Sequence, residues 1–94
     1  MSISSTELND FTRDFSRRVD AGESLTAGLA AIAATTLNLV LGQAAADCVR
    51  QLGGGSTLSQ AMARYPAVFD AEYLAVIRRG ETSGRLADAL RILA

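Results

Sequence analysis

Ninety-four residues are enough for one domain, and we expect that domain to occupy the whole chain, 1–94. A formal net charge of −1 gives no electrostatic reason to expect binding to nucleic acid or to an anionic membrane surface. The chain has no histidine, which removes the commonest general base and the commonest metal ligand and argues against an enzyme.

Two helices are predicted in the first third of the chain. Ser4 followed by Glu7 forms a capping-box pattern, which opens a first helix that ends at Gly22. A second helix follows and stops at the threonine pair 35–36. Apolar residues recur at helical spacing in both helices: Leu8, Phe11, Phe15 and Val19 in the first, and Leu25, Leu29 and Ile32 in the second.

A third and a fourth helix are predicted on either side of a glycine-rich connection. The third helix ends at the three glycines 53–55, and Ser56 or Thr57 caps the start of the fourth. Pro66 forbids continuation of the fourth helix. The apolar stripes are Leu37, Leu41, Ala44, Cys48 and Leu52 in the third helix, and Leu58, Ala61, Met62 and Tyr65 in the fourth.

The fifth and sixth helices are joined by a segment with two glycines four residues apart. One interpretation makes Gly80 the cap of the fifth helix and Ser83 the N-cap of the sixth. Another is a close backbone approach between helices, which we expect at Gly84. The stripes are Phe69, Tyr73, Val76 and Ile77, then Leu86, Ala89, Leu90 and Leu93. The chain is therefore predicted to be all-α, a compact antiparallel bundle of six short helices.

One apolar stretch and one cysteine need a separate explanation. Residues 24–46 carry no charge and are numerous enough to span a bilayer, but polar residues and glycines interrupt them. A turn near residues 35–36 between two buried helices explains this stretch better than a membrane span. Cys48 has apolar neighbours and no histidine to activate it, so we expect a small buried hydrophobic side chain.

No catalytic or cofactor-binding residue is predicted. Residues 53–57 resemble a phosphate-binding loop but lack its lysine and its preceding strand, so a structural turn is expected. Two carboxylate pairs could contribute oxygens to a hard cation such as Ca²⁺ at an interface between copies, although such pairs are usually solvated surface charges. These pairs are Asp10 with Asp14, and Glu81 with Asp88.

Three motifs in residues 52–93 occur in one register. The chain matches much of the pattern G-x-S-L-S-x-A-L, then P-x-x-F, then G-E-x-S-G-x-L-x-x-x-L, and the motif residues are Gly55, Ser59, Pro66, Phe69, Gly80, Glu81, Ser83, Gly84 and Leu86. In this order they resemble the repeat domain of the type II secretion system protein F family, which includes type IV pilus assembly platform proteins of the bacterial inner membrane. Val19 and Gly28 depart from the family's usual leucine and alanine without changing the spacing.

The resemblance implies a non-catalytic assembly domain for protein transport or pilus biogenesis at the cytoplasmic face of the inner membrane. Its implied partners are the motor ATPase and other inner-membrane assembly proteins. Family members carry two such domains separated by transmembrane helices. This soluble chain has one copy, so it is either a piece of a longer protein, with Ala94 close to where the family enters the bilayer, or a shortened protein.

We also expect self-association as a homodimer, because so many apolar residues exceed what six short helices can bury. The first helix, with Phe11 and Phe15, is the candidate interface. The competing hypothesis is a small helical DNA-binding regulator, in which the last two helices form a helix-turn-helix across residues 78–85. From Ser56 onward, however, five arginines face four acids, which is a weak basis for phosphate binding.

Overall fold

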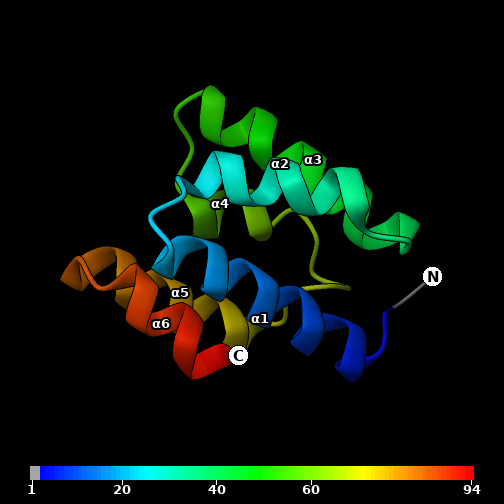
Figure 1. Cartoon of the computed structure of the whole chain (residues 1–94). Helices are drawn as coiled ribbons and strands as arrows, with labels where there is room; N and C mark the ends of the chain where they lie inside the picture. The colour runs from blue at the N-terminus through cyan, green and yellow to red at the C-terminus, as the bar shows by residue number, and fades with distance from the viewer. Residues whose placement is uncertain (1–2) are drawn as a thin grey trace.

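The computed structural model describes residues 3–94, and within them all regular secondary structure is helical (Figure 1). The prediction of an all-α fold with six helices is confirmed for these residues. The helices are α1 (Ser5–Asp20), α2 (Leu25–Thr35), α3 (Leu39–Gly53), α4 (Leu58–Met62), α5 (Ala71–Ser83) and α6 (Leu86–Leu93).

Polar side chains at the N-caps explain where five of the helices begin. Ser4 and Glu7 form the predicted capping box, in which each side chain accepts a hydrogen bond from the other residue's backbone N–H. Thr57 and Gln60 form a second capping box at α4, so Thr57 rather than Ser56 is the N-cap of this helix. The remaining side-chain N-caps are Ser24 at α2, Asn38 at α3 and Asp70 at α5.

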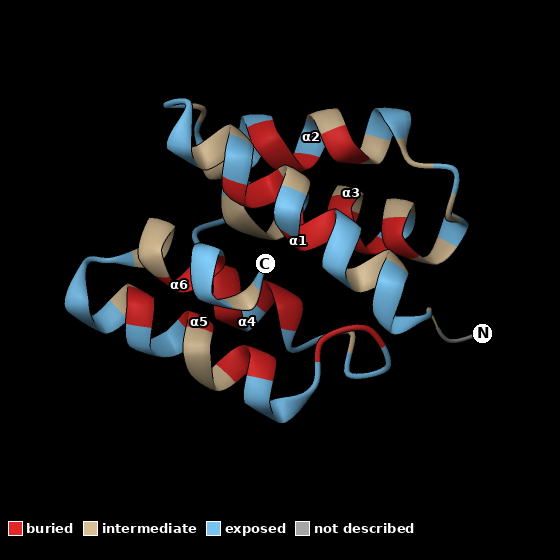
Figure 2. Cartoon of the chain, turned by 60° about the horizontal axis from the view of Figure 1, so that its bottom comes forward, coloured by how far each residue is buried: buried red, intermediate tan, exposed pale blue. Residues whose placement is uncertain are grey.

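The helices pack in a closed ring around one core. Each helix contacts the next one along the chain, and α6 returns to contact α1. In Figure 1, α1 lies between the pair α2 and α3 above it and the pair α5 and α6 below it. Figure 2 shows that the buried residues of each helix face inward, toward the neighbouring helices. Because the last helix packs on the first, both ends of the described chain are tied to the same core.

An aromatic cluster joins α1 to the segment that contains α5. The ring of Phe69 lies 5.8 Å from that of Phe11 and 5.2 Å from that of Tyr73, measured between centroids. The Tyr73 hydroxyl is 2.8 Å from Thr12 Oγ1, and this buried contact satisfies both hydroxyl groups. Burial raises the pKa of Tyr73 to about 12.

The burial of α1 overturns one prediction. Phe11 is 5% exposed and Phe15 is 0% exposed, because both rings pack into the core of this same chain. They cannot form the centre of a dimer interface while the domain stays folded. The prediction of an apolar stripe on α1 is confirmed, but the stripe is buried by α2, α6 and the aromatic cluster rather than by a second copy.

The predicted start of the third helix is also wrong. Leu37 is 99% exposed and lies in the turn between α2 and α3. The Asn38 side-chain oxygen accepts the backbone N–H of Leu41 at 3.0 Å, so the helix begins after Leu37. Phe69 likewise precedes α5 instead of lying on it, although it is buried as expected.

The uncharged stretch 24–46 is divided between α2 and α3, with Thr36 at the break. Among the described residues, none of the helices combines the length and the apolar character that a membrane crossing requires. Cys48 on α3 is 1% exposed, as predicted, and burial raises the pKa of its thiol to about 11.

Candidate functional site

Three residues of the sequence motif, Ser59, Glu81 and Gly80, lie where α5 contacts α4 and α6. The Glu81 carboxylate on α5 accepts two hydrogen bonds from Ser59, one from the backbone N–H at 2.9 Å and one from the hydroxyl at 2.6 Å. Ser59 is buried in the first turn of α4. An anionic acceptor suits this position, because the first N–H groups of a helix have no partners within the helix. The two motifs, 22 residues apart, are therefore directly bonded to each other.

Gly80 lies where α5 crosses α6. A Cβ atom at Gly80 would come within 2.7 Å of Ala89 Cβ and 3.1 Å of Leu86 Cα, which is closer than carbon atoms pack. The motif glycine is thus required because the two helices approach closely here.

Gly84 has a different structural role. Its backbone is left-handed, with φ of +72°, and its N–H donates to the carbonyl oxygen of Gly80. A Cβ atom there would meet nothing within 4 Å. The predicted roles of the two glycines are therefore exchanged: Gly84 caps α5, and Gly80 is the point of close approach.

One interpretation of the sequence made Ser83 the N-cap of α6, and the structure shows that this interpretation is wrong. Ser83 is the last residue of α5, and its hydroxyl donates to the carbonyl oxygen of Arg79 at 2.8 Å. Arg85 occupies the N-cap position of α6 without a side-chain hydrogen bond to the helix. The reason is the left-handed Gly84, which ends α5 at Ser83 and leaves only Arg85 before α6 begins.

The remaining motif residues support turns or the core. Gly55 adopts φ of +100° after α3, where the following N–H of Ser56 donates to the carbonyl oxygen of Gln51. Pro66 is exposed in the turn after α4, whereas Phe69 is buried and Leu86 partly buried against the core. The motif residues therefore serve in turns, in helix–helix contacts and in the core of the domain.

A buried carboxylate on α3 forms a polar network that the sequence analysis missed. Asp47 Oδ2 accepts the Tyr65 hydroxyl at 2.6 Å and Arg64 Nε at 3.3 Å, and Oδ1 accepts Arg50 at 2.9 Å. The hydrogen bond from Tyr65 is the main cause of a lowered pKa for the Asp47 carboxyl. The sequence did carry one signal of this network: Asp47 is a single acidic residue within an otherwise uncharged helical stripe, next to Cys48. The network ties α3 to the end of α4.

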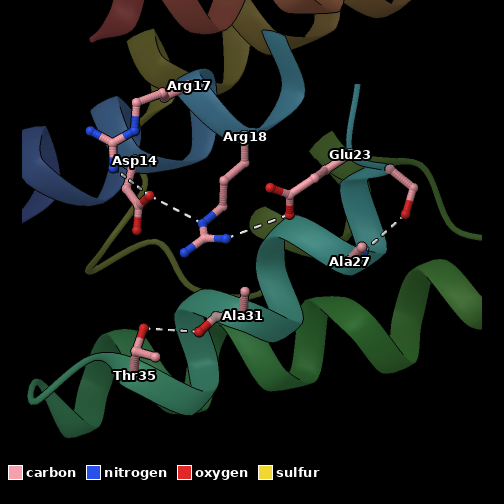
Figure 3. Close-up of polar contacts among 8 residues, drawn as sticks. Asp14, Arg17, Arg18, Glu23, Ala27, Ala31 and Thr35 are labelled. Carbon is pink, nitrogen blue, oxygen red and sulfur yellow. Dashed lines mark hydrogen bonds and ion pairs between the residues drawn. The ribbon is translucent and has the colours of Figure 1, made fainter. Parts of the chain in front are cut away.

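A second polar network lies at the junction of α1 and α2 (Figure 3). Asp14 accepts hydrogen bonds from Arg17 at 3.0 Å and from Arg18 at 3.1 Å, and Arg18 also pairs with Glu23 at 3.5 Å. Arg18 thereby links α1 to the connection that leads into α2.

The structure does not bring the two predicted carboxylate pairs together with a third ligand. Asp10 pairs with Arg13, Asp14 with the arginines of α1, and Asp88 with Arg91, while Glu81 accepts from Ser59. Within residues 3–94 no group of three or more potential metal-ligating side chains is present. The carboxylates are thus engaged with donors of the chain itself.

The fold and the contacts among Ser59, Glu81 and Gly80 define a helical domain whose motif residues stabilise the packing of its own helices. A sequence profile described as "Type II secretion system (T2SS), protein F" matches residues 11–94. The match covers most of the chain, so the chain belongs to this family, as the motifs indicated. Proteins of the family are inner-membrane platform components of type II secretion and type IV pilus systems, and they are assembly components rather than enzymes.

Proposed function

We propose that this chain is a non-catalytic assembly domain of a platform protein, placed at the cytoplasmic face of the bacterial inner membrane. There it makes protein contacts with the motor ATPase and with other inner-membrane components of a secretion or pilus system. The family match over residues 11–94 carries the proposal.

The internal use of the motif supports this role. Ser59 and Glu81 bond α4 to α5, and Gly80 permits the close crossing of α5 and α6. A domain that binds other proteins benefits from such internal contacts, because a preformed surface loses little conformational entropy on binding.

Binding to the motor ATPase of the same system tests the proposal. We expect the chain to bind this ATPase saturably in isothermal titration calorimetry, whereas the ATPase of an unrelated secretion system should give no heat beyond dilution. Equal heats with both proteins, or no saturation with either, would contradict the contact with the motor.

We further propose self-association of the domain. With Phe11 and Phe15 buried, the large apolar side chains exposed within residues 3–94 are Leu37, Leu39 and Ile92. Such residues are candidates for an interface between copies, because water contact with their side chains is unfavourable. Sedimentation equilibrium at increasing concentration tests this proposal, and a single monomeric mass throughout would contradict it.

The DNA-binding alternative has less support from the geometry. In a helix-turn-helix, α6 would be the recognition helix, but its one cationic side chain, Arg91, pairs with Asp20 at 3.1 Å and with Asp88 at 3.0 Å. Titration of duplex DNA at low salt distinguishes the two functions. Binding that weakens steeply with added salt would favour a DNA-binding protein.

A further inference from the structure

The charges of the chain are distributed unevenly along it. Residues 77–94 contain four arginines and two acidic residues, whereas residues 1–76 contain five arginines and eight acidic residues. The net charge of −1 for the whole chain therefore conceals a positive C-terminal part and a negative remainder. Such an asymmetry between two parts of a chain indicates contact with nucleic acid or with a membrane.

Three arginines of the C-terminal part form what we call the arginine patch: Arg78, Arg79 and Arg85. All three are exposed, and none forms an ion pair among the described residues. They lie in the last two turns of α5 and in the turn to α6. Each of the remaining arginines pairs with a carboxylate: Arg13, Arg17, Arg18, Arg50, Arg64 and Arg91.

The two acidic residues of the C-terminal part are engaged elsewhere. The Glu81 carboxylate accepts hydrogen bonds from Ser59 at 2.6 and 2.9 Å, on the side of α5 that faces α4. Asp88 pairs with Arg91 at 3.0 Å, and Arg91 also pairs with Asp20 of α1 at 3.1 Å. Neither acid forms an ion pair with the arginine patch, so the three guanidinium groups are available to an external anion.

The arginine patch lies on the part of the molecule that projects furthest at one end. In Figures 1 and 2 no other described segment extends as far in this direction as the turn between α5 and α6. Residues 82–84 of this projection are exposed and small, so the arginines are its largest side chains. Ile92, which is 74% exposed, lines the same groove as Arg79 and Arg85. The surface is therefore convex and basic, with one large apolar side chain beside it.

We propose that the arginine patch is a contact site for an anionic membrane surface. Guanidinium groups bind phosphate oxygens through paired hydrogen bonds, and a phosphatidylglycerol headgroup presents such a phosphate with a net negative charge. An exposed apolar side chain beside basic ones suits the boundary between headgroups and acyl chains, which favours lipid over nucleic acid. This contact rests on the proposed location at the inner membrane, but it is independent of the contact with the motor ATPase.

The contact is weak, because each basic residue near an anionic surface strengthens binding only about fivefold. Nuclear magnetic resonance detects such weak binding. When bicelles of phosphatidylcholine and phosphatidylglycerol in equal parts are added, the backbone amide signals of residues 78–85 should shift, whereas bicelles of phosphatidylcholine alone should leave them unchanged. The shifts should diminish as salt rises from about 0.05 to 0.5 M, because the charges are exposed to solvent.

A pair of double variants tests the position of the site. Arg79→Gln with Arg85→Gln removes two charges from the arginine patch and should weaken binding to the anionic bicelles about 25-fold. Arg13→Gln with Arg17→Gln is the matched control, because it changes the net charge equally at exposed side chains that pair with acids of α1. The control should bind within about twofold of the wild type. Circular dichroism verifies that both variants are folded.

Equal weakening in the two double variants would overturn the proposal, because net charge rather than the arginine patch would then govern binding. So would equal shifts with anionic and neutral bicelles, or shifts confined to other helices. Tighter binding of duplex DNA than of anionic bicelles through the same residues would assign the arginine patch to nucleic acid instead. A wild-type chain that shows no shifts with anionic bicelles would also refute the lipid contact, whereas calorimetry with the motor ATPase would still decide the proposed protein contact separately.

Discussion

Gly80 faces Ala89 across the crossing of α5 and α6, where there is no space for a further carbon atom. Gly84 lies four residues later in open solvent and has a left-handed backbone. One glycine is therefore required by its neighbours and the other by its own φ angle. Substitutions can separate these two requirements.

Gly80→Ala should destabilise the domain although alanine is the better helix former. The added methyl group would lie 2.7 Å from Ala89 Cβ, and overpacking of this kind costs about 1–3 kcal/mol. The gain in helix propensity is only about 0.8–1.0 kcal/mol. Urea denaturation measures the difference. Gly53→Ala is the control, since a Cβ there meets nothing within 4 Å, and this variant should be neutral or stabilising.

Gly84→Leu should cost about 1–2 kcal/mol because an L-residue is strained at positive φ. Gly84→Asn should cost clearly less, since asparagine tolerates the left-handed conformation at a helix end. Thermal melts of the two variants provide the comparison. Equal losses for both would contradict the left-handed backbone as the reason for Gly84.

At the level of elements, side-chain bonds hold short helices that could not persist alone. The helix α4 has five residues, far fewer than an isolated helix needs in water. Its N-terminal N–H groups are satisfied by Thr57 and by Glu81 of α5. The position of α4 therefore depends on α5, which comes later in the chain.

The bond between Ser59 and Glu81 should be measurable in a double-mutant cycle. Ser59→Ala and Glu81→Ala should show a coupling of about 1–2 kcal/mol, as is usual for a hydrogen bond to a charged group that leaves its partner unsatisfied when broken. Urea denaturation of both single variants and of the double variant yields the coupling. Glu72→Ala is the control, because Glu72 is exposed on the same helix. Additive effects at Ser59 and Glu81 would contradict the tie between α4 and α5.

For the whole molecule, closure of the ring of helices keeps Cys48 away from solvent. Its thiol is 1% exposed, and burial raises its pKa to about 11. As pH rises, the unfolded chain loses this proton near the ordinary value of 9.0, whereas the folded chain retains it until about 11. The unfolded state thus binds fewer protons in this range, so the thiol lowers the free energy of unfolding from about pH 9 upward.

Cys48→Ala should therefore lose less stability than the wild type between about pH 8 and 10.5, since the substituted side chain does not titrate. Urea denaturation across this range measures the two slopes. In the wild type at neutral pH, a thiol reagent should label Cys48 only as fast as the domain opens. Rapid labelling of the folded protein, or parallel pH slopes, would contradict the closed core.

Local patterns were sufficient to predict the class of fold and the number of helices. Apolar residues at helical spacing, the capping box at Ser4 and Pro66 after α4 act within a few residues of themselves. Such signals do not depend on the rest of the chain, which is why the six helices and the family were predicted correctly. The errors near Leu37, Tyr65, Phe69 and Ser83 concern helix ends, where one side-chain or backbone hydrogen bond decides the boundary.

The sequence by itself determined the helices, the apolar stripes and the family. Only the tertiary structure decided which partner each residue meets: Phe11 and Phe15 face their own core, Glu81 bonds Ser59, and Gly80 rather than Gly84 lies at the helix crossing. The physical reason is distance along the chain. Propensity and capping act between near neighbours, whereas these contacts join residues that only the closed ring of helices brings together.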